Sequence, residues 1–406
     1  MVNLSRGVTH LLPFVVMAAA VAPLFSNAVS QILLGVAILL LLLQWQKAAM
    51  PPVALPLILF LGGTLLAVAL SEEPRVGLPQ VKKFYVFAML PVLYTAIRSA
   101  EQVRTIYFGW VLLATGSAGW AFVQFSRKWS DTVAARQDFY LAYVGSRVTG
   151  FMSHWMTFSA EQMIVGLMLT SLLIFGAFRT RRFLWLGALC IIGASIGVAW
   201  TRSVWLGTIA GVCYLIAAWR PGLLLLVPPL LAVIWFIAPA SLQERVTSLY
   251  KPHGTSDSNE HRRITARTGV EMVRAHPWFG LGPEMPGRQF ARYLPSDVTR
   301  PLPSGFYGHL HNLYLQYAAE RGIPVLLVFL WLIVRVIRDF VIGARKIVVD
   351  DAFRRAALHG SVAAIIGLLV EGLFEHNLGD SEILTLFLVI VASGYVLLRK
   401  DEAAHA

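Results

Sequence analysis

The sequence predicts an all-α polytopic membrane protein with about 12 transmembrane helices and a helical cap formed by one large loop outside the membrane. Of its 406 residues, 57% are hydrophobic and only 14% are charged, and the mean hydropathy is +0.66. Soluble domains carry about 25% charged residues. Long apolar runs also recur along the chain, and Lys and Arg alternate between the loops that separate them. These observations exclude a disordered chain, a disulfide-stabilised secreted scaffold and an ordinary cytosolic enzyme.

A helix needs about 20 mostly apolar residues to cross the hydrocarbon core of a bilayer. Runs of this kind predict twelve spans, at residues 8–25, 28–44, 53–70, 84–98, 104–125, 157–178, 183–200, 203–219, 221–238, 308–337, 356–374 and 382–398. The first run is closely followed by the second, so we expect it to stay in place as a span. The chain then divides into nine helices over 1–238, a large loop over 239–307, three helices over 308–400 and a tail over 401–406.

Basic residues predict the orientation, because short cytoplasmic loops carry an excess of Lys and Arg. With the N-terminus inside, the tight turns at residues 179–182 and 219–222, which contain four arginines, fall on the cytoplasmic side. An even number of spans then places both termini in the cytoplasm and the 239–307 loop outside. Long loops cross regardless of charge, so the basic residues of this loop do not oppose the orientation.

The outer face is rich in arginine. In a soluble protein, a formal net charge of +12 would suggest nucleic-acid binding. In a membrane protein it is interpreted first as a sign of the orientation in the membrane and of binding to anionic lipid substrates. Because guanidinium groups match phosphate oxygens in a bidentate way, the cluster predicts a site for an anionic lipid-linked ligand. Any single arginine could instead reach the lipid head groups. The outer arginines are Arg75, Arg127, Arg136, Arg147, Arg202, Arg245, Arg262, Arg263, Arg267, Arg274, Arg288, Arg292, Arg300 and Arg321.

Within the large loop, residues 262–274 read as an amphipathic helix with Ile264, Val270 and Val273 as its apolar side. Among the outer arginines, Arg202 is the strongest single candidate for a functional residue. It lies between two apolar runs joined by almost no loop, and a charge so near hydrocarbon is usually functional.

The two cysteines, Cys190 and Cys213, lie in apolar runs without partners at metal-ligand spacing, and are interpreted as small core residues.

Two histidines lie where the chain re-enters the membrane. His311 could act as a general base near neutral pH, and helical spacing would place it on one face with Tyr314 and Gly322. His309 and His311 could instead cap a helix, or hold a metal together with His261 or Glu260, although their spacing fits no strong metal signature.

Taken in order, these motifs resemble the O-antigen ligase family, whose superfamily also includes O-antigen polymerases and protein O-oligosaccharyltransferases. The large loop lies late in the chain and contains the stretch His-Pro-Trp-Phe-Gly-Leu-Gly at 276–282. His311 and Gly322 match the superfamily's pattern of a histidine, ten residues and a glycine. Residues 147–154 and 201–203 are similar to its arginine-containing stretches. The resemblance covers roughly residues 140–380.

The resemblance implies a glycosyltransferase of the bacterial inner (cytoplasmic) membrane that uses no cofactor and no metal, with its active site facing the periplasm and the large loop forming a periplasmic cap. The implied donor is a glycan on undecaprenyl pyrophosphate and the acceptor a sugar hydroxyl of lipid A–core; membrane lipids surround it, and no nucleic acid is expected. By resemblance, His311 takes the catalytic place. The implied pyrophosphate-binding residues are Arg202 and Arg263, with Arg262 as the adjacent alternative, and Arg147; further candidates are Asp380, Tyr314 and His309.

A glycosyl pyrophosphate is already activated, so the reaction needs no ATP. We expect a single displacement with inversion, because no outer carboxylate is placed as an obvious nucleophile. Three alternatives stay open: a polymerase with a lipid-linked acceptor, a protein O-oligosaccharyltransferase, which usually carries a soluble domain after the last span, and a transporter. Transporters tend to carry ionisable residues at mid-membrane, whereas charges here cluster at one face.

Overall fold

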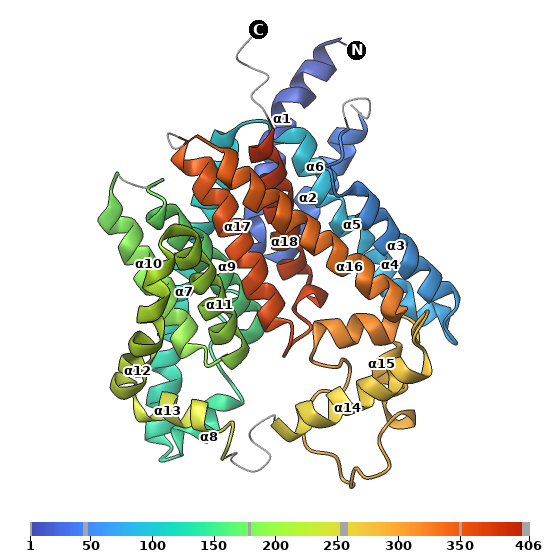
Figure 1. Ribbon diagram of the computed structural model, residues 1–406, viewed down its shortest axis with the longest axis vertical. Coiled ribbons are helices and arrows are strands. Elements are labelled where there is room, and N and C mark those ends of the chain that lie inside the picture. Colours follow the sequence, from blue (N-terminus) through green and yellow to red (C-terminus); the bar gives the residue numbers. More distant parts are fainter. Residues whose placement is uncertain (1, 44–47, 178–179, 252–258, 349–350, 400–406) are drawn as a thin grey trace.

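The computed structural model describes residues 2–43, 48–177, 180–251, 259–348 and 351–399, and this part of the chain is helical without a β-strand (Figure 1). The first half contains α1 (Val2–Val21), η1 (Ala22–Leu24), α2 (Asn27–Leu42), α3 (Ala54–Ala69), η3 (Pro74–Gly77), α4 (Leu78–Lys82), α5 (Phe84–Phe87), α6 (Met89–Ala96), α7 (Ala100–Ala134), α8 (Phe139–Val144), α9 (Trp155–Ile174) and α10 (Arg182–Val198). The second half contains α11 (Arg202–Trp219), η4 (Pro221–Leu226), α12 (Val227–Ile237), α13 (Ala240–Thr247), α14 (Asn259–Ala275), α15 (Met285–Arg288), η6 (Phe290–Arg292), α16 (Leu313–Lys346), α17 (Ala352–Glu371), η7 (Asn377–Gly379) and α18 (Ser381–Leu398). The predicted all-helical class is confirmed.

Five of the described helices, α7, α9, α11, α17 and α18, are long and apolar enough to cross a membrane. A sixth span results if residues 221–237 and α13, which are bent by 120° at their junction, form one broken span. Leu11–Leu24, α2, α3 and α10 are apolar but have only 10–17 residues. A membrane protein is therefore supported, whereas the predicted count of twelve spans is not confirmed.

Three of the predicted spans are interrupted. Residues 84–98 divide into α5 and α6. Residues 221–238 form a 3₁₀ turn and the 11-residue α12, and in the run 308–337 the helix begins only at Leu313 and breaks at Gly322. Each run contains proline, which removes one backbone donor and clashes with the carbonyl group four residues earlier. Apolar composition alone therefore overestimated the continuity of these helices.

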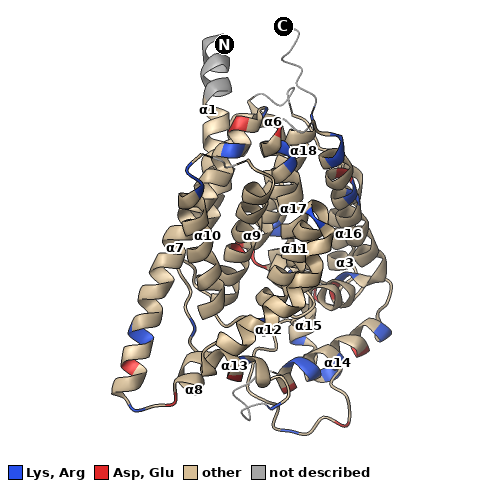
Figure 2. Cartoon of the chain, turned by 60° about the vertical axis from the view of Figure 1, so that its left-hand side comes forward, with Lys and Arg blue, Asp and Glu red and all other residues tan. Residues whose placement is uncertain are grey.

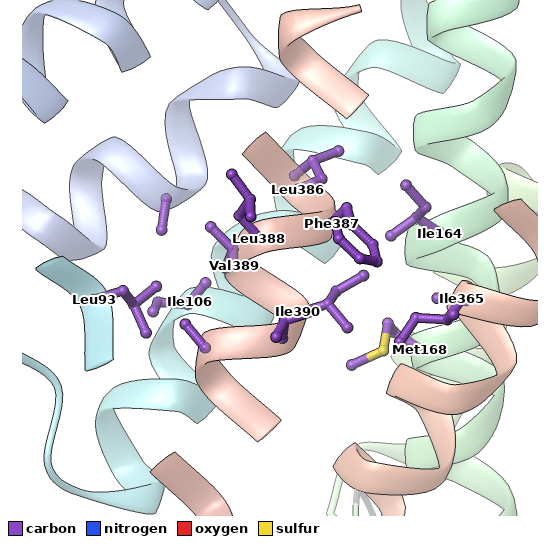
Figure 3. Close-up of a cluster of buried hydrophobic side chains, with 14 of the residues drawn as sticks. Leu93, Ile106, Ile164, Met168, Ile365, Leu386, Phe387, Leu388, Val389 and Ile390 are labelled. Carbon is purple, nitrogen blue, oxygen red and sulfur yellow. The ribbon is translucent and has the colours of Figure 1, made fainter. Parts of the chain in front are cut away.

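The interior of the bundle is formed by α9, α17 and α18. Residues 383–397 of α18 are buried on every side, as are most residues of α9 and α17. Figure 3 shows Leu386–Ile390 of α18 among the side chains of Leu93, Ile106, Ile164 and Ile365, which come from four other helices. A helix that is apolar all round belongs in a protein core. By contrast, no residue of α12 is buried, and its apolar side chains suit contact with lipid.

Helices α11 and α17 approach each other closely through glycine. A β carbon at Gly207 would lie 2.6 Å from the carbonyl oxygen of Gly367, and one at Gly211 would lie 2.9 Å from that of Ala363. Small residues four apart on one helix let two backbones pack directly, as in many membrane helix pairs. This contact holds the N-terminus of α11, which begins at Arg202, against the interior helices.

Gly207→Ala is expected to destabilise the protein by about 1–3 kcal/mol, because the added methyl group overpacks this contact. The measurement is the thermal unfolding temperature in detergent, which should fall. Gly193→Ala on α10 is the matched control, since a β carbon there meets nothing within 4 Å and alanine favours the helix. Equal unfolding temperatures for the two variants would contradict the close approach of α11 and α17.

The break in α16 is filled by residues 277–282 of the large loop. Gly322 has φ +82°, a conformation that favours glycine, and a β carbon there would collide with the carbonyl group of Trp278. Three backbone hydrogen bonds join the two segments: Leu281 N to Ala319 O at 2.8 Å, Gly282 N to Glu320 O at 2.9 Å, and Ile323 N to Pro277 O at 2.8 Å. The break thus fixes the large loop on the bundle.

The two ends of the bundle differ in what they carry. Helices α8, α13, α14 and α15 gather at one end, whereas the start of α1 and the end of α18 lie at the other (Figure 1). Lys, Arg, Asp and Glu concentrate towards both ends and leave the middle of the helices largely uncharged (Figure 2). The helices of the 239–307 loop therefore lie opposite the start of α1 and the end of α18. The predicted tail at 401–406 lies outside the described residues.

Candidate active site

A cavity of about 710 Å³ lies among α14, the N-terminal ends of α9, α11 and α18, and the segment before α16. This volume is typical of small-molecule sites. Its ionisable and imidazole lining consists of Lys83, Arg147, His154, Arg202, Arg245, His261, Arg262, Glu284, His309, His311, Glu320, Glu375, His376, Asp380 and Glu382. Six residues predicted from the sequence therefore meet in one cavity: His311, Arg202, Arg147, Arg262, Asp380 and His309.

His311 lies just before α16 and not on it. The helix is capped by Asn312, whose Oδ1 accepts from the backbone N–H of Leu315 at 2.8 Å. The backbone of His311 has φ +49°, a conformation that is uncommon outside glycine and often found at functional sites. The expectation that helical spacing aligns His311 with Tyr314 is therefore wrong, because the helix begins after the histidine.

Both ring nitrogens of His311 face oxygen atoms. Nδ1 lies 3.3 Å from the carboxylate of Glu375, and Nε2 lies 3.0 Å from the carbonyl oxygen of Phe306. The carboxylate can hold the Nδ1–H tautomer, whose Nε2 lone pair can accept a proton once a hydroxyl group replaces the Phe306 carbonyl. The Phe306 carbonyl marks the position from which a hydroxyl group would approach Nε2.

Glu375, in the turn after α17, links the histidines to the arginines. Its carboxylate lies 3.6 Å from Arg262 Nη2 and 3.6 Å from His309 Nε2, in addition to the contact with His311. Burial alone would raise the pKa of Glu375, but the hydrogen bond and charge of His311 and the charge of Arg262 lower it to about 2. The carboxylate is therefore ionised at neutral pH and can orient the guanidinium of Arg262 and the imidazole of His311.

Four guanidinium groups from four separate segments line the cavity. Arg147, before α9, and Arg245, on α13, both donate to the carbonyl oxygen of Trp200, at 3.2 Å and 3.3 Å. Arg202, at the start of α11, donates to Ser248 Oγ at 3.0 Å and Asn259 Oδ1 at 2.8 Å. Arg262 is the fourth and belongs to α14. Hydrogen bonds to the protein thus hold three of these groups in place, and Glu375 faces the other.

The crowding of these groups costs free energy. Burial, together with the nearby charges of Arg245 and Arg262, lowers the pKa of Arg147 to about 9. Burial also lowers the pKa of Arg262, with Arg245 adding to the effect and Glu375 opposing it. An anion in the cavity would relieve this repulsion between like charges, so the electrostatics favour a ligand such as phosphate or pyrophosphate.

Residues 188–330 match the family model described as O-antigen ligase. This match supports a relationship to the O-antigen ligase family over this segment, and the predicted resemblance is confirmed. No curated protein matches the chain. The matched segment runs from α10 into α16 and contains Arg202, Arg245, Arg262 and His311. Glu375 and Asp380 lie beyond it.

Two residues that the sequence predicts for the site do not line this cavity. Arg263 is exposed and borders a separate hollow of about 260 Å³, with Glu260 and the ion pair of Arg267 and Asp297. Tyr314 lies in α16 and donates its hydroxyl group to the carbonyl oxygen of Leu369 at 2.8 Å. Of the two adjacent arginines, the structure therefore places Arg262 and not Arg263 beside His311.

His309, His311 and Glu375 form a possible metal-ligand set, since one ligand atom of each lies within 4.8 Å of the others. Two imidazoles and a carboxylate can hold a divalent ion. The metal site considered from the sequence instead combined the two histidines with His261 or Glu260. In the structure, Glu260 borders the separate hollow beside Arg263, and His261 Nε2 faces the Phe306 carbonyl at 2.9 Å. Arginines line the same cavity and oppose a dication by charge repulsion. The surroundings therefore favour an anion.

Asp380 lies on a wall of the same cavity. Its carboxylate accepts a hydrogen bond from Thr157 Oγ1 at 2.8 Å. Burial raises the pKa of Asp380, the bond from Thr157 opposes this, and the charge of Glu375 adds to it. Lys83, from the region of α4 and α5, donates to the carbonyl oxygen of Gly379 at 2.9 Å and also lines this wall.

Sequence reasoning missed two residues of this cavity. Arg245 was counted only among the outer arginines, and Glu375 was not singled out. A signal for Glu375 exists, since a Glu-His-Asn stretch directly follows an apolar run. Its pairing with His311, 64 residues earlier, is visible only in the folded chain.

Proposed function

We propose that this protein is an O-antigen ligase that transfers a glycan from undecaprenyl pyrophosphate to a sugar hydroxyl of lipid A–core without a metal ion. The main support is the single cavity in which an imidazole with a carboxylate partner meets four guanidinium groups, in a chain whose residues 188–330 match this family. The proposal includes an inner-membrane location with about twelve crossings, both termini in the cytoplasm and the cavity facing the periplasm.

The arginines would bind the pyrophosphate of the donor. Arg147, Arg202, Arg245 and Arg262 can supply several bidentate hydrogen bonds to phosphate oxygens. As the glycosyl bond breaks, negative charge grows on the departing pyrophosphate, and fixed cations in a partly buried cavity stabilise that charge. They would thus fill the role that a divalent metal has in many sugar transferases.

His311 would act as the general base. The acceptor hydroxyl takes the place of the Phe306 carbonyl opposite Nε2 and gives its proton to this nitrogen. The acceptor oxygen then forms a bond to the anomeric carbon while the bond from that carbon to the pyrophosphate oxygen breaks, and the electron pair leaves with the pyrophosphate. A single displacement of this kind inverts the anomeric configuration. A glycosyl adduct isolated on Glu320 or Asp380, which also line the cavity, would contradict this mechanism.

The test is transfer by the purified protein from a lipid-linked glycan donor, with and without EDTA. The ligase proposal predicts product on lipid A–core, whereas an O-antigen polymerase would extend a second lipid-linked glycan. Activity that is unchanged by EDTA agrees with the metal-independent mechanism. Activity that EDTA abolishes and a divalent ion restores would instead assign His309, His311 and Glu375 to a metal.

Glu375→Gln is expected to slow transfer by about 10- to 100-fold. Loss of the carboxylate that orients a catalytic histidine in a serine protease costs about 10⁴-fold, and we expect less here because Glu375 is shared with Arg262. The rate at saturating donor should fall more than donor affinity. Glu271→Gln on the outer side of α14, where Glu271 pairs with Arg274, is the control. Equal rates for the two variants would exclude Glu375 as the partner of His311.

A further inference from the structure

A groove of about 400 Å³ lies at the end of the bundle opposite the active-site cavity, between α6, α16 and α18. It shares no lining residue with that cavity. Arg335 and Lys346 of α16 and Arg399 after α18 line it, together with the carboxylate of Asp339. Three cations against one carboxylate leave an excess of two positive charges in the groove.

The carboxylate of Asp339 is already engaged. Its Oδ2 accepts from Arg335 Nε at 2.9 Å and from the hydroxyl group of Tyr395 at 2.9 Å. The bond to Asp339 uses only Nε of Arg335, so the outer edge of the guanidinium can contact an incoming anion. Asp339 therefore orients one cation of the groove and leaves the excess charge available.

Arg399 is also held in place before any ligand arrives. Its Nη2 donates to the carbonyl oxygen of Tyr94 at 2.6 Å, and its guanidinium carbon lies 3.5 Å from the centre of the Tyr94 ring. Because the side chain is ordered by these contacts, binding an anion would cost little conformational entropy.

Apolar side chains continue the groove. Ile342 and Leu398 line it beside the cations, and Ile342 is more than one third exposed. A soluble anion would gain nothing from these side chains, whereas a lipid could place its phosphate on the cations and its acyl chain against Ile342 and Leu398. The combination of chemistries favours a lipid over free phosphate.

We propose that this groove binds the phosphate head group of an anionic phospholipid, such as phosphatidylglycerol. The site is independent of the glycan-transfer site and of the proposed function. Basic pockets between transmembrane helices commonly bind anionic lipids in this way. A lipid in the groove would bridge α6, α16 and α18 and stabilise their packing.

The test uses the full chain in detergent and measures phosphatidylglycerol binding by native mass spectrometry. Arg335→Gln/Lys346→Gln should weaken binding by about 25-fold, since each basic residue near an anionic lipid contributes about fivefold. Arg182→Gln/Arg220→Gln removes the same charge elsewhere and should bind like wild type. Arg335→Lys/Lys346→Arg keeps the charge and should retain binding if the fold is intact.

Three results would overturn the proposal. The first is equal phosphatidylglycerol affinity for wild type and Arg335→Gln/Lys346→Gln. The second is equal binding of zwitterionic phosphatidylethanolamine, which would exclude selectivity for anions. The third is full displacement of the lipid by an equal concentration of soluble glycerol phosphate, which would assign the groove to a small anion.

Discussion

Replacing His311 with alanine is expected to reduce glycan transfer by about 10²–10⁴-fold, the contribution that a positioned general base makes to a reaction rate. His311 lines the cavity, with Nδ1 facing Glu375 and Nε2 facing the Phe306 carbonyl that the acceptor hydroxyl would replace. In the proposed mechanism, an alanine leaves that hydroxyl without a proton acceptor. The measurement is the initial rate at saturating donor and acceptor. Donor affinity should change little, because the four arginines that line the cavity and that we propose as the pyrophosphate site remain.

The matched control for this experiment is His276→Ala. His276 lies in the large loop that precedes His311 in the chain, where its Nε2 faces the hydroxyl group of Tyr293 at 2.8 Å, and the residue does not line the cavity. A rate near wild type is expected for this variant. Retained activity in His311→Ala would remove the proposed base, and a comparable loss in both variants would show that the loop, not the imidazole, was disturbed.

The apolar runs of the sequence predict most helices well but not the spans. Residues 157–178 and 382–398 correspond closely to α9 and α18, because a helix buried on all sides must be apolar on all sides. The runs at 84–98 and 221–238 are equally apolar, yet proline breaks them. Hydropathy measures which residues tolerate lipid or a core, and it carries no information on where the backbone hydrogen bonds stop.

The amphipathic helix in the large loop was predicted at the right place, but one residue of its apolar side was assigned wrongly. The structure buries Ile264 and packs Val273 against the same apolar cluster, as expected, but it exposes Val270 and buries Thr265 and Gly269. A β carbon at Gly269 would lie 2.6 Å from Leu315 Cδ2, so close packing against α16 requires small residues on this face. A hydrophobicity pattern cannot detect a contact that is made by the absence of a side chain.

A second limit on prediction from the sequence is the pairing of residues that lie far apart in the chain. The sequence identified His311 and three of the four cavity arginines as candidates, because charge at a membrane boundary is costly and therefore informative. It could not select Glu375, since acidic residues in short outer loops are common and this one matters only through its distance to His311. Which carboxylate lies beside His311 therefore depends on how the chain folds and not on the sequence around either residue.

Arg262→Ala should reduce transfer by about 10²–10³-fold, whereas Arg263→Ala should stay within about threefold of wild type. Loss of one preorganised group that stabilises developing negative charge costs about 10²–10³-fold. Adjacent residues on a helix point about 100° apart, so only one of the two can face His311. The structure places Arg262 in the cavity beside Glu375 and Arg263 on the hollow with Glu260.

The pair is a stringent test because both variants remove the same charge from the same helix, one residue apart. A general electrostatic effect of the basic loop would lower both rates equally, and a site on the other side of α14 would reverse the order. Arg262→Lys separates charge from geometry: it keeps the cation but loses the bidentate fork, and an intermediate rate is expected. A lysine variant as active as wild type would mean that Arg262 acts only as a distant charge and does not hold the pyrophosphate.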